Sequence, residues 1–253
     1  MMENSDFRVV EAPQVLIRGR KPHAKSGPID AVHIACRTLP IVVKRLTVPR
    51  NGDERQALRI LLGVRSQITH QATAMFNTVT ALVRTNDLGT DARKPLPKKQ
   101  IRQISVWRTR DTDSFSQSLA RAEAKRIATG VTTLWEEAKD NLAALDALTQ
   151  SISPALRTMI GVGPVSSAQC LISWPHPGRI HSEAAFAALA GASPIPASSR
   201  NTQRQRMNRG GDRQLNQALH NVSLVRMRTE PNTRTYVEKR TRKTKANVKP
   251  CAA

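Results

Sequence analysis

Residues 53–86 read DERQALRILLGVRSQITHQATAMFNTVTALVRTN, and their apolar side chains recur at steps of three and four. This period predicts a long amphipathic helix with a narrow apolar seam. A second helix is predicted over 114–150, where Gly130 weakens it midway and leaves open a division into two shorter helices. Two long helices joined by a linker predict an antiparallel coiled-coil hairpin over 53–150. The seam of the first helix consists of Leu58, Leu61, Val64, Ile68, Ala72, Met75, Val79 and Leu82.

A basic linker at 90–110 connects the two predicted helices. Its DARKPLPKKQIRQISVWRTR stretch carries seven Lys or Arg residues, and its one acid stands at the first position. Such a cluster suits phosphate groups, and we expect Lys98 and Lys99 to contact nucleic acid. Asp111 and Asp113 follow the linker, and helix capping explains them more simply than metal binding does.

The charge balance of the 253-residue chain indicates a polyanionic partner, because 40 Lys and Arg face 19 Asp and Glu for a net charge of +21. Nucleic acid is favoured over an acidic membrane surface, since no run approaches about 18 apolar residues. Eight aromatic residues (Trp 3, Tyr 1, Phe 4) leave the core to Ala, Leu, Val and Ile, which favours helices. Trp107, Trp135 and Trp174 are too scattered for a base-stacking platform, and we expect them to be packing residues.

The cysteines indicate neither a disulfide framework nor a zinc site, because Cys36, Cys170 and Cys251 are far apart and odd in number. His33 and Cys36 lie one helical turn apart, but no second pair accompanies them, so a structural role is expected. The first residues, MMENSDFRVVEAPQ, lack the basic and apolar segments of a signal peptide. A reducing cytoplasm fits these features.

Residues 151–238 have the pattern of a small all-α domain. The stretch SPALRTMIGVGPVSSAQCLISW starts with Ser153-Pro154, a cap followed by proline at the first helical position. It then predicts a helix, a tight turn containing Gly161 and Gly163, and a second helix. This is the pattern of a helix-hairpin-helix, in which glycines let backbone N–H groups approach a phosphate. The alternative is a simple helix-turn-helix corner in the core.

Two more helices are predicted downstream, one capped by Ser182 and one starting at Asp212. Between them, PIPASSRNTQRQRMNRGGDRQLNQAL at 194–219 places the pair Ser198-Ser199 in a basic loop. A hydroxyl among guanidinium groups suits an anion such as a phosphodiester, and an ordinary polar loop is the alternative. The basic tail at 239–253 is predicted to be disordered. Four arginines are candidate phosphate ligands, with a solvated face as the alternative: Arg204, Arg206, Arg209 and Arg213.

Four motifs in this order resemble the C-terminal domain of the DEDD-type insertion-sequence transposases, which are understood as bridge-RNA-guided serine recombinases. They are GVGP, PIPASS, NRGGDRQLNQAL and LVRMRT-P-TR-YV, all within 153–237. Upstream, GRKPHAKSGPIDA at 19–31 resembles the family's K-S-D-P-I-D-A motif, and the long helices correspond to its coiled-coil region. The resemblance covers about residues 7–240.

The resemblance implies a metal-binding RNase H-like domain, of which 1–52 would be an α/β remnant, and a nucleophilic serine in the C-terminal domain. The serine corresponds to Ser199, with Ser198 as the fallback, and Asp30 corresponds to one Mg²⁺ ligand. Bound Mg²⁺ polarises a phosphodiester, and a serine ester conserves bond energy for rejoining. Implied partners are DNA, a bridge guide RNA and further copies in a homodimer or tetramer, without a membrane. The implied location is the bacterial cytoplasm, associated with the nucleoid.

Two departures from the family pattern bear on activity. Gly27 stands at the position of the family's first motif Asp. Arg200 stands at the position of the glycine that follows the nucleophilic serine in the family. With the segments that bear the family's first Asp and its Glu also missing, one of four metal ligands is left. We therefore expect an N-terminally truncated, degenerate DNA transposase or recombinase that is catalytically impaired and does not hold Mg²⁺ stably. The alternative is a non-catalytic DNA- or RNA-binding remnant protein.

Overall fold

The computed structural model divides into two compact units. One comprises residues 1–52 with 175–180, and the other comprises 53–174 with 181–253. Within the ranges that the structure describes, no helix is both long and apolar enough to cross a bilayer. The described residues are 9–11, 27–46, 48, 52–175, 180–198, 204–206 and 208–247.

The first unit contains helix α1 (Gly27–Thr38) and the short 3-10 helix η1 (Val43–Arg45). Asp30 belongs to the first turns of α1, but its side chain lies outside the described residues. His33 and Cys36, also on α1, are both exposed. The RNase H-like remnant expected in this part of the chain stays a prediction.

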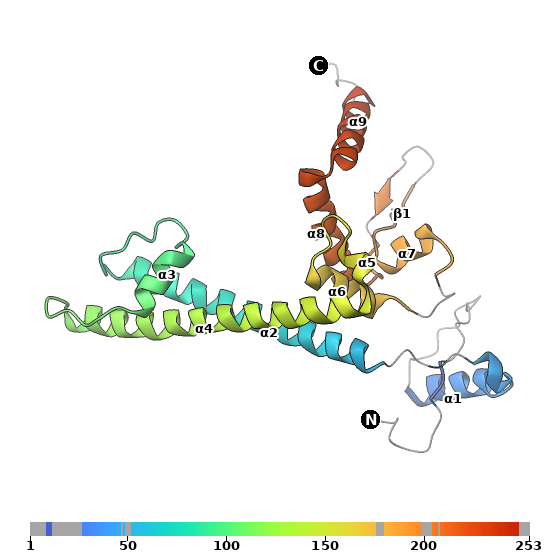
Figure 1. The fold of residues 1–253 in the computed structure, drawn as a ribbon, viewed down its shortest axis with the longest axis horizontal. Coiled ribbons are helices and arrows are strands. Elements are labelled where there is room, and N and C mark those ends of the chain that lie inside the picture. Colours follow the sequence, from blue (N-terminus) through green and yellow to red (C-terminus); the bar gives the residue numbers. More distant parts are fainter. Residues whose placement is uncertain are drawn as a thin grey trace. The chain divides into compact units, whose positions relative to one another are not determined.

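The second unit is built on two long antiparallel helices, α2 (Asp53–Thr85) and α4 (Phe115–Ile152) (Figure 1). Their bounds lie within two residues of the predicted ones. A capping box starts α4: the Ser114 hydroxyl accepts from the backbone N–H of Gln117, whose side chain accepts from the N–H of Ser114. This reciprocal pair satisfies two donors that the helix start would otherwise leave free.

Gly130 does not divide α4, so the split that the sequence left open does not occur. A Cβ at this position would meet the Cε atom of Met75 on α2. The missing side chain therefore makes room for a seam residue of the facing helix. Packing against α2 outweighs the lower helix propensity of one glycine, which is worth about 1 kcal/mol.

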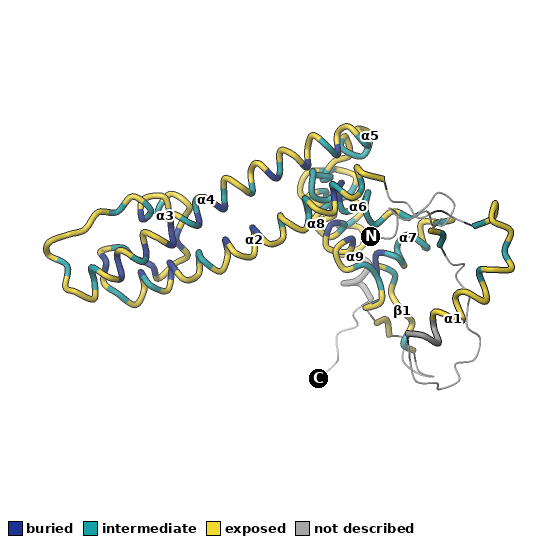
Figure 2. The backbone as a smooth tube through the Cα atoms, turned by 90° about the horizontal axis from the view of Figure 1, so that it is seen from below, coloured by how far each residue is buried: buried dark blue, intermediate teal, exposed yellow. Residues whose placement is uncertain are grey.

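Buried residues concentrate at the end of the long helices where helix α3 (Lys98–Ser105) packs on α4 (Figure 2). The prediction of a linker over 90–110 is therefore wrong for its second half. Ile101 and Ile104 of α3 are fully buried, one helical turn apart on the same face. Two apolar residues are too few to reveal a helical period in the sequence, so only the packing identifies α3. The cluster also contains Val79, Val83, Leu88, Ala92, Leu96, Ala120, Ala124, Ile127, Ala128 and Val131.

A buried ion pair closes this end of the helices. The Arg121 guanidinium donates from Nε to Asp113 Oδ2 (2.5 Å) and from a terminal nitrogen to Asp113 Oδ1 (3.1 Å). It also donates to the carbonyl of Leu88 and lies 4.8 Å from the centre of the Trp107 ring. The predicted capping role of Asp113 is therefore wrong, because Ser114 is the cap and Asp113 pairs with Arg121 instead.

A small domain adjoins the other end of the long helices. Its α6 packs against both of them through a core that contains Leu58, Leu145 and Ala168. Arg55 of α2 donates from Nε to the carbonyl of Ile172 (3.1 Å). The mainly α fold predicted from the sequence is confirmed. The elements of this domain are α5 (Pro154–Arg157), α6 (Pro164–Ser173), α7 (Glu183–Leu189), β1 (Ile195–Pro196), β2 (Gln205–Arg206), α8 (Arg213–Thr229) and α9 (Pro231–Asn247).

The predicted helix starts in this domain are largely confirmed. Ser182 caps α7 by accepting from the N–H of Ala185, and Asp212 caps α8. Ser153 stands at the start of α5 with proline after it, but its side chain makes no capping bond. The predicted disorder from residue 239 onward is wrong up to Asn247, where α9 ends. Residues 248–253 lie outside the described residues.

Candidate nucleic-acid interface

The glycine turn between α5 and α6 is held against α8. Gly161 has a φ of +84°, and a Cβ there would lie 2.9 Å from the carbonyl oxygen of Val222. Arg157 donates to the carbonyl of Val162 (2.5 Å) inside the turn. Packing and backbone conformation thus explain why position 161 is a glycine. This is what the alternative of a simple helix-turn-helix corner would require. Gly163 precedes α6 with open space around it, and phosphate contact at either glycine stays a prediction.

Asp212 connects three helices of the domain at one point. Its Oδ1 atom accepts from the N–H groups of Gln214 (2.9 Å) and Leu215 (3.0 Å) at the start of α8. Its Oδ2 atom accepts from the hydroxyl of Ser173 at the end of α6 (2.5 Å). Its own N–H donates to the carbonyl of Leu189 at the end of α7 (2.7 Å). Asp212 therefore positions the start of α8 and already uses two of the free N–H groups there.

A cavity of about 480 Å³ lies beside this helix start. Two glycines shape its wall, because a Cβ on Gly211 would overlap the backbone nitrogen of Gly191. Gly191 itself has a φ of +65°, which favours glycine. The lining residues are Ala190, Gly191, Asn208, Arg209, Gly211, Arg213, Asn216 and Gln217.

The charge of this cavity comes from Arg209 and Arg213 alone among its lining residues. In the described part of the chain, neither arginine forms an ion pair. Asn208 and Asn216 are partly engaged, since they bond to the N–H of Gly210 and the carbonyl of Ala190. A polar cavity with two unpaired guanidinium groups suits an anion with several oxygens, such as phosphate.

The segment that bears Ser198 and Ser199 is flanked by two short strands of two residues each. Strands β1 and β2 pair antiparallel, with Ile195 opposite Arg206, and the N–H of Ala197 donates to the carbonyl of Arg204 (2.9 Å). Ser198 is exposed directly after this last bond. Ser199 lies outside the described residues. The chain between β2 and α8 then runs through Arg209 and along the cavity, so hairpin and cavity belong to one continuous segment.

The structure brings together some of the predicted site residues and separates others. Arg209 and Arg213 line one cavity, while Arg204 and Arg206 are exposed at the hairpin. Lys98 and Lys99 lie on α3, at the opposite end of the long helices from α8 (Figure 1). Lys98 lies 5.2 Å from the centre of the Trp135 ring. Asp30 belongs to the other unit.

The sequence did not single out Asn208, Asn216 and Gln217 as residues of this site. The available signal was their position around Gly-Gly in MNRGGDRQLNQAL, on either side of a helix start. Amide side chains there have their own local hydrogen bonds, so residue type alone does not separate a lining role from a structural one.

The described residues form no complete set of ligands for a divalent metal ion, and the side chain of Asp30 lies outside them. Nowhere in the ranges that the structure describes do three or more His, Cys, Asp or Glu side chains gather closely enough to hold one. The charged residues of the cavity are arginines, which repel a cation. Nor does Cys170 supply a reactive thiolate, because burial raises the pKa of its thiol. The implied Mg²⁺ therefore has no complete set of ligands in the described part of the chain.

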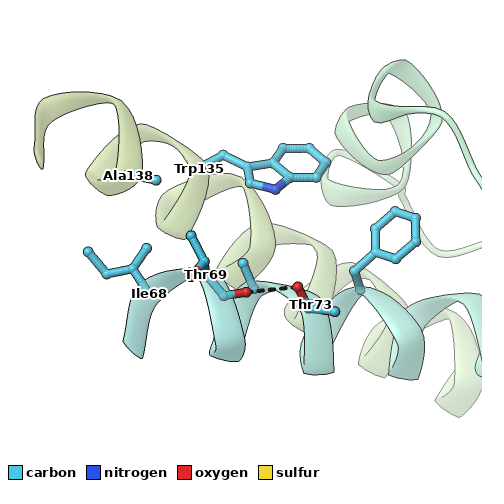
Figure 3. Close-up of a pocket in the computed structure, with 7 residues that line it drawn as sticks. Ile68, Thr69, Thr73, Trp135 and Ala138 are labelled. Carbon is cyan, nitrogen blue, oxygen red and sulfur yellow. Dashed lines mark hydrogen bonds between the residues drawn. The ribbon is translucent and has the colours of Figure 1, made fainter. Parts of the chain in front are cut away.

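A second cavity, of about 220 Å³, lies between α2 and α4 (Figure 3). Trp135 and Ala138 line it from α4, opposite Ile68 of α2. The hydroxyl of Thr73 also faces this region but donates to the carbonyl of Thr69 on its own helix (2.8 Å). Because none of its described lining residues is charged, this cavity offers packing surface and no acid–base group from that part of the chain.

Comparison with known proteins adds one finding about the same domain. Residues 153–238 match the family model described as Transposase IS116/IS110/IS902 family. A search of curated proteins gave no match. The matched segment contains the turn at Gly161, the hairpin of β1 and β2, the cavity lined by Arg209 and Arg213, and the first part of α9. Over these residues the chain is similar to insertion-sequence transposases, which supports a role as a DNA transposase.

Proposed function

We propose that this chain acts in DNA transposition by holding nucleic-acid phosphates in the cavity of Arg209 and Arg213, which lies on the segment that follows the hairpin of β1 and β2. One observation carries this proposal: both arginines lack an acidic partner in the described part of the chain and line the same cavity. Arginine forks bind phosphate oxygens with two hydrogen bonds, which fixes both position and orientation. The family match supports DNA as the source of the phosphate.

The resemblance supplies the chemical step of the proposal. The Ser199 oxygen attacks phosphorus, the bond from phosphorus to the leaving deoxyribose oxygen breaks, and the serine proton ends on that oxygen. The two guanidinium groups stabilise the negative charge on the phosphoryl oxygens in the transition state. Partners of this step are DNA, a bridge guide RNA and one or three further copies of the chain. We place it with the bacterial nucleoid.

We propose further that the chain by itself does not complete strand exchange. An unassisted serine is a weak nucleophile at neutral pH, and none of the described residues that line the cavity is a His, Asp or Glu that could take its proton. The described residues hold no metal-ligand cluster either. Gly27 and Arg200 also depart from the family pattern. These observations favour a second candidate function, a nucleic-acid-binding protein without catalysis.

A salt titration tests the binding step. Nucleic-acid affinity should fall by about 10³–10⁵ between 50 and 200 mM salt if six to ten phosphates are contacted. We expect the double variant Arg209→Gln/Arg213→Gln to bind more weakly with a shallower salt slope. The matched control, Arg59→Gln/Lys125→Gln, removes the same charge from exposed positions on α2 and α4. Equal losses in the two variants would refute a specific role for the cavity.

A denaturing gel separates the two candidate functions. The chain is incubated with Mg²⁺, guide RNA and a nicked DNA substrate, and a covalent protein–DNA band is sought. We expect no band from the wild-type chain. A band that disappears in Ser199→Ala would establish catalysis and the nucleophile together, whereas one that disappears only in Ser198→Ala would move the nucleophile by one residue.

A further inference from the structure

Helix α9 (Pro231–Asn247) has almost no apolar surface that it could bury against the rest of the chain. Of its twelve residues with described side chains, Thr233 and Val237 are half-buried and the others are exposed. Among the described elements, α9 packs on α8 alone. A helix that is polar on all sides needs ion pairs along its length or a partner. Most of the stability of a helix in a protein comes from packing of an apolar face, and the threonines of this 17-residue helix lower its propensity further.

The charges of α9 are almost entirely positive. Glu238 is the helix's one acid, and no ion pair joins it to a cation within the described residues. At about 100° per residue, Arg234, Arg242 and Lys239 spread over an arc of about 140°, and Arg240 lies about 100° beyond. Cations thus cover more than one side of the helix and repel one another. The Lys and Arg residues are Arg234, Lys239, Arg240, Arg242, Lys243 and Lys245.

The junction with α8 sets the direction of this helix. Glu230, between the two helices, accepts two hydrogen bonds from Arg226 in the last turn of α8 (2.9 and 3.0 Å). Its carboxylate also accepts from the hydroxyl of Thr233 in the first turn of α9. These bonds, that of Thr233 foremost, lower the pKa of Glu230. Pro231 follows with its fixed φ. The hydrogen bonds of Glu230 and the proline ring therefore both restrict the backbone between α8 and α9.

We infer that α9 is an arm that inserts into the major groove of duplex DNA. This inference rests on the proposed function, since it assumes that the chain binds nucleic acid. The 17-residue helix is about 25 Å long. The major groove of B-DNA, about 12 Å wide, admits one helix, and phosphates line both of its walls. Cations on two flanks of α9 match that arrangement.

The same features argue against other polyanions. Side chains cannot enter the deep, narrow major groove of A-form RNA. Proteins that bind single strands stack bases on aromatic rings, whereas α9 has one aromatic residue, Tyr236, on which the Arg240 guanidinium lies (5.3 Å). An anionic membrane surface is bound by helices with an apolar face, which α9 lacks.

The test compares three variants of the full chain on a 30-base-pair duplex, on a 30-nucleotide single strand and on phosphatidylserine vesicles. The arm variant is Arg234→Gln/Lys239→Gln/Arg242→Gln. The cavity variant is Arg209→Gln/Arg213→Gln. The control variant, Arg59→Gln/Lys125→Gln/Lys139→Gln, removes three exposed cations from the long helices. Circular dichroism checks that each variant is folded.

We expect the arm variant alone to lose preference for the duplex. Three phosphate contacts contribute about 2.7 to the salt slope, so its duplex affinity should fall about 40-fold less than that of the wild type between 50 and 200 mM salt. Duplex binding like the wild type, or equal losses on duplex and single strand, would overturn the inference. So would vesicle binding without duplex binding. Duplex loss in the arm variant with an unaffected cavity variant would support the arm and refute the cavity proposal.

Discussion

The two ends of the long helices use arginine in opposite ways. At the end covered by α3, Arg121 is 4% exposed and has a carboxylate, a carbonyl and an aromatic ring as partners. At the other end, Arg209 and Arg213 face a cavity and have no acidic partner among the described residues. The first arrangement is complete within the chain, whereas the second lacks a counter-charge.

This difference teaches where to look for function in a chain of net charge +21. Most of its cations are exposed, so exposure and charge density do not identify a site. A guanidinium that is buried must be paired, because desolvation of an unpaired charge is costly. One that lines a cavity without a partner is free to bind an anion, and this favours the small domain as the ligand-binding end.

We expect the largest effect from a substitution that removes the cavity but keeps its two arginines. In Gly211→Ala, the new methyl group would overlap the backbone of Gly191 and lie 2.9 Å from the carbonyl carbon of Ala190. Backbone on both sides cannot yield as a side chain does, so we expect a loss of about 3 kcal/mol or more in the free energy of unfolding. Gly163→Ala, in open space, should cost about 1 kcal/mol. Urea denaturation measures both, and equal costs would contradict the described wall.

The second effect concerns the opposite end of the long helices, where the buried ion pair of Arg121 and Asp113 is broken. Arg121→Met leaves the buried Asp113 carboxylate without its partner, so we expect a lower melting temperature and faster amide exchange around α3. Nucleic-acid affinity should stay near that of the wild type, the reverse of the cavity variant. Arg126→Met, which removes an exposed pair with Glu123, should change stability little. If Arg121→Met instead weakened binding at unchanged stability, the assignment of the two ends would be reversed.

A smaller effect concerns acid. Hydrogen bonding from Arg121 is the main reason that the pKa of Asp113 lies below its ordinary value of 3.8. For a lowered folded-state pKa, the stabilisation is fully present above pH 3.8 and is lost as the pH falls through the folded value. The difference in stability between wild type and Arg121→Met should therefore narrow as the pH falls below 3.8 and through the folded-state value, as followed by thermal unfolding at stepped pH. A constant difference between them down to the most acidic stable pH would refute this origin of the stabilisation.

The smallest effect tests the long helices themselves. Gly130→Ala raises helix propensity by about 1 kcal/mol, but the new methyl group displaces the end of the Met75 side chain. Because that end is flexible, we expect a net change within about 1 kcal/mol of zero in either direction. A loss well above this in urea denaturation would show that the contact between α2 and α4 is tighter than the structure has it.

The elements with strong local signals were predictable from the sequence. The period of three and four located α2 and α4, and polar caps marked the starts of α7 and α8. Helix α3 was not predicted, because two buried isoleucines give no readable period. The role of Asp113 was misassigned because a carboxylate near a helix start resembles a cap in sequence, although its partner lies eight residues further on. Helix α9 was missed because its composition resembles that of a disordered tail.

For the candidate site, the sequence by itself determined the residue types: a serine pair, four arginines and a Gly-Gly step before a capped helix. It also determined the large positive charge, which is independent of folding. Only the tertiary structure decided which arginines share a cavity, because that depends on the approach of Gly191 to Gly211 across 20 residues of chain. Close packing of distant backbone segments leaves no periodic pattern in a sequence. Charge and caps act within a few residues, whereas a cavity exists only where separate segments meet.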